Sequence, residues 1–356
     1  MESTSPDWFL LVGPAMASAW IIRHGSARSG FRYVGPDARP VRNARQLARI
    51  AALRVPPAWR DVHIASSQRA EIQAWGFDAK GRRQYRYHTR AVERGSQRKY
   101  YRMRRLARDL PRIRDALRRD LHATDERQRV AAAVTLLLTK GFLRVGSERY
   151  ARENKTFGVT TLRKQHVTLR GDALEFCYRG KRGIAQRNVV VDRELAAFVN
   201  RLLEAPGSRL FRYRDGGRWR DLTARDVNDY LRRLTGVRIN AKDFRTWGGT
   251  VRVATVLAEL GPADSRRDAH RNVVMALRLV AAELGNTPAI CRGSYVHPIV
   301  IARYEDEGET IAIERFSRRR GRRGYYPEER ALLAFLDRHF PERRRRPRSE
   351  DLARAA

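Results

Sequence analysis

Short alternating runs of apolar and polar residues fill the first 90 residues of the chain. Aromatic and β-branched residues recur at every second position in GFRYVG, DVHIASS, EIQAWGFDAKG and RQYRYH, and Gly and Asp separate these runs. A two-residue period of this kind predicts β-strands joined by short turns. In the last run it places Tyr85 and Tyr87 on one face of a strand.

From about residue 97 the apolar residues recur at helical spacing. The segment DERQRVAAAVTLLLTKGF aligns Val130 with Val134 and Leu137, which predicts a buried core helix. Further upstream, Asp109 and Pro111 fit a helix cap and a first-turn proline, so a new helix is expected to begin there.

A three-stranded signal follows in HVTLR, LEFCYRG and QRNVVVD. Both connections are short and contain glycine, which favours an antiparallel meander with Lys181 in its second turn. Helices are then expected at about 193–204, 224–234, 241–260 and 265–284. In GNTP, Gly285 suits the position after a helix, while Thr287 and Pro288 suit the start of the next. Tyr295 would then lie in or just after a short helix.

These patterns predict an α+β fold with two domains. We expect a small β-rich domain at 26–96 and a mainly α domain with a three-stranded antiparallel sheet at 97–310; the resemblance described below implies that the first binds DNA and the second is catalytic. Residues 1–25 are interpreted as a leader of uncertain order, and 311–356 as an Arg-rich extension. In that extension RFSRRRGRRGYY and PERRRRPRSE flank one amphipathic helix. The arginine runs are expected to add sequence-independent phosphate contacts.

The charge of the chain points to a polyanionic partner. Lys and Arg number 74 and Asp and Glu 39, a net charge of 74 − 39 = +35. A GC-rich genome explains a preference for Arg over Lys but not the excess over acidic residues, so nucleic acid is the expected partner. The apolar stretch at 8–22 is too short to span a bilayer, and we expect no membrane partner and a cytoplasmic, nucleoid-associated protein. The two cysteines fit no metal-ligand spacing, and no metal or cofactor is expected.

Several catalytic classes lack their motifs in this sequence. It contains no GxxxxGK[ST], GxSxG or HExxH, and no clustered carboxylates for a two-metal nuclease. Arginines can hold phosphate oxygens in place of a metal, a tyrosine hydroxyl can attack phosphorus, and a lysine can protonate the leaving oxygen. The chain therefore has the residue types for metal-free phosphoryl transfer.

An ordered set of motifs makes this chemistry specific. FLRVGSERYARENKTFGVTTLRKQHV (142–167) resembles the signature of type IB DNA topoisomerases, most closely their bacterial, poxvirus-like branch. YRGKRG, AKDFRTWGGT and LGNTPAICRGSYVHP follow in the order of that family, and VPPAWRDVHI and DAKGRRQYRYH are similar to its N-terminal domain. The resemblance covers about residues 30–306 and implies the fold shared by tyrosine recombinases and type IB topoisomerases.

The resemblance implies a role for each matching residue. Tyr295 matches the nucleophile, Arg144 and Arg245 the two phosphate-binding arginines, and Lys181 the general acid. Asn286 stands where poxvirus and eukaryotic members have His; an amide can donate a hydrogen bond but does not titrate, so we expect a supporting role. His297 does not match the family His and is interpreted as structural. The expected DNA contacts are Arg83, Gln84, Tyr85, Tyr87 and Arg292.

The implied activity is supercoil relaxation through a 3′-phosphotyrosyl intermediate, without ATP or metal, by a monomer that clamps double-stranded DNA. A tyrosine recombinase is an alternative, although these usually carry HxxR where this chain has KDFR (242–245). A non-enzymatic basic DNA-binding protein is the other alternative, and it gives no reason for the order Arg, Lys, Arg, Tyr. Covalent trapping of DNA separates this last class from the two enzymes.

Overall fold

The computed structural model describes residues 20–236, 239–314 and 324–340. Its contacts divide the chain into two compact units, residues 1–98 and 99–356. The division falls inside the long helix α2 (Thr89–Asp120), which begins well before the helix start expected at residue 97. The expected α+β class is confirmed, with a β-rich first unit and a mainly helical second unit.

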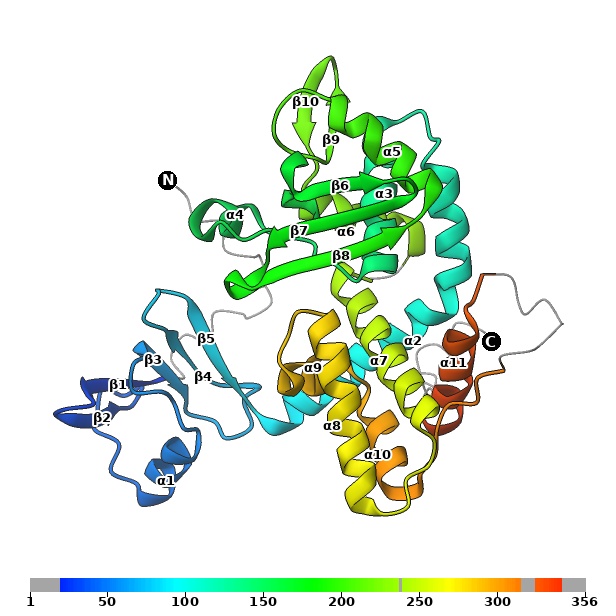
Figure 1. The fold of residues 1–356 in the computed structure, drawn as a ribbon. Coiled ribbons are helices and arrows are strands. Elements are labelled where there is room, and N and C mark those ends of the chain that lie inside the picture. Colours follow the sequence, from blue (N-terminus) through cyan, green and yellow to red (C-terminus); the bar gives the residue numbers. More distant parts are fainter. Residues whose placement is uncertain (1–19, 237–238, 315–323, 341–356) are drawn as a thin grey trace, which may run out of the picture. The chain divides into compact units, whose positions relative to one another are not determined.

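In its described residues, the first unit has one antiparallel sheet of five strands with one short helix packed against it, followed by the first turns of the long helix α2 (Figure 1). The strand order is β2-β1-β3-β4-β5. Ile50 of the helix packs against apolar side chains of the sheet, among them the fully buried Ile21 and Ile64. The elements are β1 (Trp20–Ser26), β2 (Gly30–Val34), α1 (Ala44–Ala52), β3 (Arg60–Ala65), β4 (Ile72–Phe77) and β5 (Arg83–Tyr87).

Strand β1 corrects the expected leader. Residues 1–25 were assigned to it, but Trp20–Ser26 pairs with both β2 and β3 and so occupies the interior of the sheet. Its apolar residues were interpreted as part of a continuous apolar run, whereas burial of Ile21 against α1 makes them a strand. Residues 1–19 lie outside the described residues.

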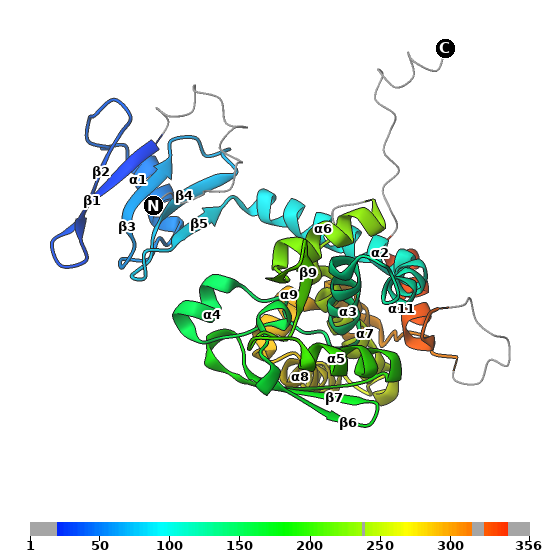
Figure 2. The same cartoon turned by 90° about the horizontal axis from the view of Figure 1, so that it is seen from above.

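The second unit is built around α3 (Glu126–Gly141), in which residues 130–139 are all buried. Because every face of this stretch is covered, it is apolar all round rather than striped. Figure 2 shows α5, α6, α7 and β9 around it. The remaining helices are α4 (Glu148–Asn154), α5 (Arg193–Glu204), α6 (Ala224–Thr235), α7 (Ala241–Leu260), α8 (Arg266–Glu283), α9 (Pro288–Tyr295), α10 (Pro298–Glu307) and α11 (Pro327–His339).

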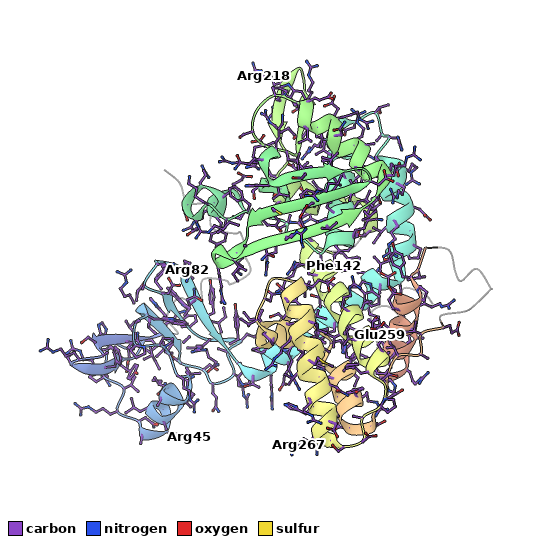
Figure 3. All side chains as sticks on the ribbon, viewed as in Figure 1. Arg45, Arg82, Phe142, Arg218, Glu259 and Arg267 are labelled. Carbon is purple, nitrogen blue, oxygen red and sulfur yellow. The ribbon has the colours of Figure 1, made fainter. Side chains whose placement is uncertain are left out.

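The expected meander is present as β6 (Val167–Arg170), β7 (Ala173–Arg179) and β8 (Ala185–Val191), paired antiparallel in that order. A two-stranded hairpin, β9 (Arg212–Asp215) and β10 (Arg218–Asp221), was not predicted from the sequence. Arg218 lies at its tip (Figure 3). The helix cap expected at Thr287 is confirmed, and Thr223 caps α6.

The helix start expected at Asp109 is wrong, because α2 runs through this point without a break. Pro111 removes one backbone donor from the helix. The apolar stripe nevertheless continues through Leu106, Leu110 and Ile113, which are all buried, so packing outweighs the loss. The other side of the Pro111 ring lies against Gly324, where an added Cβ would come within 2.7 Å of it.

Helix α11 joins the expected Arg-rich extension to the core. Glu329, only 5% exposed, accepts two hydrogen bonds of 2.8 Å from Arg114 of α2 and one of 3.3 Å from the indole of Trp247 of α7. This part of 311–356 is therefore an integral element, while the two arginine runs fall largely outside the described residues. Within the described residues no single helix is long and apolar enough to cross a membrane, although α8 and α9, bent by 89°, pass as a pair by length and composition.

Asp192 joins α2, α3 and α5 at the start of α5, where it is the N-cap residue. Its buried carboxylate caps α5 through the Leu195 N–H and pairs with Arg118 of α2 and Lys140 of α3. Burial alone would raise the pKa of Asp192, but the hydrogen bonds from Arg118 and Lys140 outweigh burial and hold this pKa well below its ordinary value. The charge therefore stabilises the fold above the unfolded pKa of about 3.9 and loses this effect as the pH falls.

We expect Asp192→Asn to lower the free energy of unfolding by about 2 kcal/mol at pH 7, because Asn still caps the helix but removes the carboxylate that pairs with Lys140 and Arg118, of which Arg118 keeps Glu194 at 2.6 Å. Urea unfolding at pH 7 and at pH 3 measures this. The difference between wild type and variant should narrow at pH 3. An equal difference at both pH values would contradict a role for the carboxylate charge.

Candidate active site

Arg245 is the most deeply buried of the expected site residues, with 5% of its surface exposed. It lies near the start of α7, and its guanidinium donates to the carbonyls of Phe142 and Leu284, the latter at 2.7 Å. These two residues are the C-caps of α3 and α8. Helix C-termini carry partial negative charge and unpaired carbonyls, so both suit a buried cation. Burial, followed by repulsion from Arg144, lowers the pKa of Arg245 from its very high ordinary value.

The same two helix ends bring Arg144 and Asn286 together. Each lies two residues beyond a carbonyl that Arg245 holds. Arg144 donates to the Gly285 carbonyl at 3.0 Å and to the side-chain oxygen of Asn286. Gly285 has a φ of +60°, and an added Cβ would meet the Gln186 side chain at 2.3 Å, so glycine is required at this turn.

Two buried donors at this point have no acceptor in the part of the chain that the structure describes. They are the Nε of Arg245 and the Nδ2 of Asn286. Because the side-chain oxygen of Asn286 accepts the hydrogen bond from Arg144, its amide nitrogen is left as a donor. Unpaired buried donors beside two guanidinium groups form a site that suits an anion.

Tyr295 is the last residue of α9, and it is half-buried. The guanidinium carbon of Arg245 lies 5.1 Å from the centre of its ring. Burial would raise the pKa of Tyr295, but the positive charges of Arg245 and Arg144, with a smaller effect from Lys242, outweigh it, and this pKa lies below its ordinary value. A phenol with a lowered pKa is a better nucleophile near neutral pH.

Lys181 lies apart from these four residues. It is exposed in the short turn Lys181–Gly183 between β7 and β8. Among the described residues, no hydrogen bond or ion pair joins it to Arg144, Arg245, Asn286 or Tyr295. Three residues earlier, the buried Tyr178 interacts electrostatically with both arginines, and burial raises its pKa. The turn that carries Lys181 therefore extends from a strand that faces the arginines.

Sequence analysis missed Lys242 as a charge that acts on Tyr295, and helical spacing is the signal that could have identified it. It lies one turn before Arg245 on α7, where residues three apart share a face. Tyr178 offered no such signal, because only the pairing of the strands with the helices brings it to the arginines.

The expected DNA contacts in the first unit occupy two faces of β5. Tyr85 and Tyr87 share a face and stack at 5.8 Å, and Tyr87 is 52% exposed. Arg83 lies on the same face, with its guanidinium 4.4 Å from the ring of Trp75 on β4. Gln84 alternates to the other face and donates to Asp78 at 3.0 Å.

Sequence analysis missed how far this aromatic face extends. Trp75 pairs with Tyr85 across the strands and stacks on His63 of β3 at 3.9 Å with an interplanar angle of 4°. The alternation of EIQAWGF, already used to predict β4, could have placed Trp75 there. Rings interleaved with arginine suit both the backbone and the bases of nucleic acid.

Arg292, the remaining expected DNA contact, is exposed on α9 and pairs with Glu305 of α10 at 3.5 Å. His297 is buried and caps α10 by accepting the Ile299 N–H at 3.2 Å. Burial lowers the pKa of His297 to about 3, so it is neutral at physiological pH. Within the described residues, no three His, Cys, Asp or Glu side chains are grouped to hold a metal ion.

A tyrosine beside two arginines has the residue types of an enzyme that transfers phosphoryl groups. A family model described as eukaryotic DNA topoisomerase I, catalytic core, matches residues 88–318, and one described as bacterial DNA topoisomerase IB, N-terminal domain, matches residues 30–78. DNA topoisomerase 1B of Acanthamoeba polyphaga mimivirus is 29% identical over 274 residues, which cover 74% of this chain and 82% of the relative. DNA topoisomerase 1B of Vaccinia virus (strain Copenhagen) is 24% identical over 238 residues, covering 65% and 72%.

The chain belongs to the type IB DNA topoisomerase family. It is an isomerase that breaks and rejoins strands, and DNA is its substrate. Its N-terminal unit is of the bacterial type.

Gly249 tests how closely α7 and the end of α9 must approach. A Cβ added there would lie 2.9 Å from the Tyr295 carbonyl oxygen and 3.2 Å from its Cβ. We expect Gly249→Ala to displace Tyr295 and slow DNA relaxation on the order of 10-fold, because small misplacements of reacting groups are costly. Gly95→Ala, in a helix with nothing within 4 Å of the added Cβ, is the matched control and should relax DNA normally. Equal rates for the two variants would show that the close approach of Gly249 to Tyr295 is not needed for activity.

Proposed function

We propose that this enzyme relaxes supercoiled DNA through a covalent 3′-phosphotyrosyl intermediate at Tyr295. The observation that carries the proposal is the position of Tyr295 beside Arg245, whose guanidinium carbon lies 5.1 Å from the centre of its ring; Arg245 and Arg144 also lower the pKa of Tyr295 against the opposing effect of burial. Arg245 and Asn286 carry the unpaired buried donors described above. One set of positive charges thus serves both the nucleophile and the phosphate.

In the cleavage step the Tyr295 oxygen attacks phosphorus and gives up its proton to solvent water, and the bond from phosphorus to the 5′ oxygen breaks. Lys181 gives a proton to that oxygen, which leaves as a 5′ hydroxyl, while the 3′ phosphate stays on the tyrosine. Arg144, Arg245 and Asn286 bind the non-bridging oxygens, whose charge grows in the transition state. Reversal of the same steps reseals the strand.

The energy of the broken phosphodiester is conserved in the phosphotyrosine, so we propose that resealing needs no ATP. We also propose that no metal is needed, because two guanidinium groups supply the positive charge that Mg²⁺ supplies elsewhere. Between cleavage and resealing, the strand with the free 5′ hydroxyl rotates about the intact strand.

We further propose that one chain clamps double-stranded DNA as a monomer, since the expected nucleophile, arginines and lysine all belong to one unit. The aromatic and basic face of β4 and β5 would contact the duplex from the other unit. A net charge of +35 supports sequence-independent phosphate binding over both. We propose a cytoplasmic location on the nucleoid.

The first test is relaxation of negatively supercoiled plasmid in EDTA without ATP, with wild type beside Tyr295→Phe. We expect the wild type to relax the plasmid and form a denaturant-stable DNA adduct, and the variant to do neither, because only its nucleophilic oxygen is missing. Equal activity of both would assign the nucleophile to another residue. Adduct formation at one fixed sequence without relaxation would favour a recombinase.

Lys181 is tested by changing the leaving group. We expect Lys181→Ala to slow cleavage about 100-fold on ordinary DNA, the usual range for loss of a general acid. At a cleavage site mapped from the trapped adduct, a substrate with sulfur in place of the 5′ oxygen needs no proton, since a thiolate leaves readily. The variant should cleave this substrate as fast as wild type. A defect that persists with sulfur would assign Lys181 to phosphate binding instead.

A further inference from the structure

The backbone that follows the nucleophile is held by side chains of two other helices. Helix α9 ends at Tyr295, and the next residue, Val296, is extended. The last carbonyls of a helix have no partner within it. Here the carbonyls of three consecutive residues lie within hydrogen-bonding distance of side-chain donors. Lys99 donates to Ser294 at 3.3 Å, and Tyr100 donates to Val296 at 2.8 Å. The Thr250 hydroxyl lies 3.2 Å from the Tyr295 carbonyl oxygen.

Thr250 also binds the segment in a second way. Its oxygen accepts the N–H of His297 at 3.1 Å, and its single proton is shared between the Tyr295 carbonyl and that of Thr246 at 2.7 Å. Thr250 follows Gly249, whose missing side chain lets α7 approach Tyr295. The segment is thus held by α7 through Thr250 and by α2 through Lys99 and Tyr100.

We propose that Lys99, Tyr100 and Thr250 are positioning residues, which hold the backbone on either side of Tyr295 and so fix its oxygen relative to the phosphate-binding arginines. The proposal rests on Tyr295 being the nucleophile. A tyrosine at the end of a helix is attached to backbone that would otherwise fray. Attack on phosphorus requires the reacting atoms to be held about 3 Å apart, so this backbone needs an external support.

The surroundings of Lys99 support a specific role. Its ammonium is half-buried and lies 4.1 Å from the ring centre of Tyr100. Burial, and then Lys242 and Arg102, lower the pKa of Lys99 to about 8, while Asp243 opposes them. The neighbouring His297 is already neutral at this pH. Lys99 therefore loses its charge as the pH rises through about 8, and its donation to the Ser294 carbonyl weakens.

The decisive variant is Tyr100→Phe, which removes one hydroxyl from a side chain that is 4% exposed. Tyr230→Phe is the matched control: Tyr230 is 3% exposed, and its hydroxyl donates to Asp120 at 2.7 Å. Both variants lose one buried hydrogen bond, and because Tyr230 donates to a carboxylate, Tyr230→Phe should lose at least as much stability on thermal unfolding as Tyr100→Phe. Only Tyr100→Phe should cleave more slowly.

The measurement is covalent adduct formation in a single turnover, with saturating DNA and binding affinity determined separately. We expect Tyr100→Phe to cleave about 10-fold more slowly with unchanged affinity, and Tyr230→Phe to cleave like wild type. Thr250→Val, which lacks the hydroxyl, should also slow cleavage. Thr250→Ser, which keeps the hydroxyl, should cleave at the wild-type rate. We expect the wild type to cleave more slowly above pH 8, and Lys99→Arg, which stays charged, to show no such loss of rate.

Wild-type cleavage by Tyr100→Phe, or equal losses in both Phe variants, would overturn the positioning role. Tyr295→Phe is assayed beside them. An adduct formed by Tyr295→Phe would instead show that Tyr295 is not the nucleophile. An inactive Tyr295→Phe together with a fully active Tyr100→Phe would refute the positioning role alone.

Discussion

The structure of the active site depends on the burial of one charge. Arg245 is almost entirely excluded from water, and a buried cation is tolerated only if most of its donors are paired. The carbonyl ends of α3 and α8 pair its two terminal nitrogens and leave Nε without an acceptor among the described residues, so the two helices must end at the same place. The chain that leaves each end then carries Arg144 and Asn286 into contact. The guanidinium that joins the two helix ends is thus also the one beside Tyr295.

Tyr295, the proposed nucleophile, experiences opposing effects in this environment. Burial favours the neutral phenol, and the nearby arginines favour the phenolate. The arginines prevail, so the protein prepares Tyr295 electrostatically before substrate arrives. A DNA phosphate would then enter a site whose positive charge is already fixed in place, which lowers the reorganisation needed during the reaction. Asn286 contributes a dipole without a titrating charge, so the site keeps its charge across the neutral pH range.

The sequence predicted most of the elements whose signal is local. The meander around Lys181, the Tyr85 and Tyr87 face and the cap at Thr287 followed from periodicity and turn chemistry. Two errors came from tertiary packing: burial turned part of the expected leader into β1, and an unbroken apolar stripe carried α2 through Pro111. The expected site residues came from an ordered resemblance. The carbonyl partners of Arg245 could not be predicted, because they join segments that are far apart in the chain.

Helix α11 packs on the catalytic core but lies outside the segment that matches the family model. Similarity to the topoisomerase catalytic core ends at residue 318, before this helix begins. Yet Glu329 neutralises Arg114 and holds Trp247, whose helix α7 also carries Arg245. The residues that complete the packing around Arg114 and Trp247 therefore extend beyond the segment that matches the catalytic-core model. A chain cut at residue 318 would leave the Arg114 guanidinium and the Trp247 indole without their carboxylate partner.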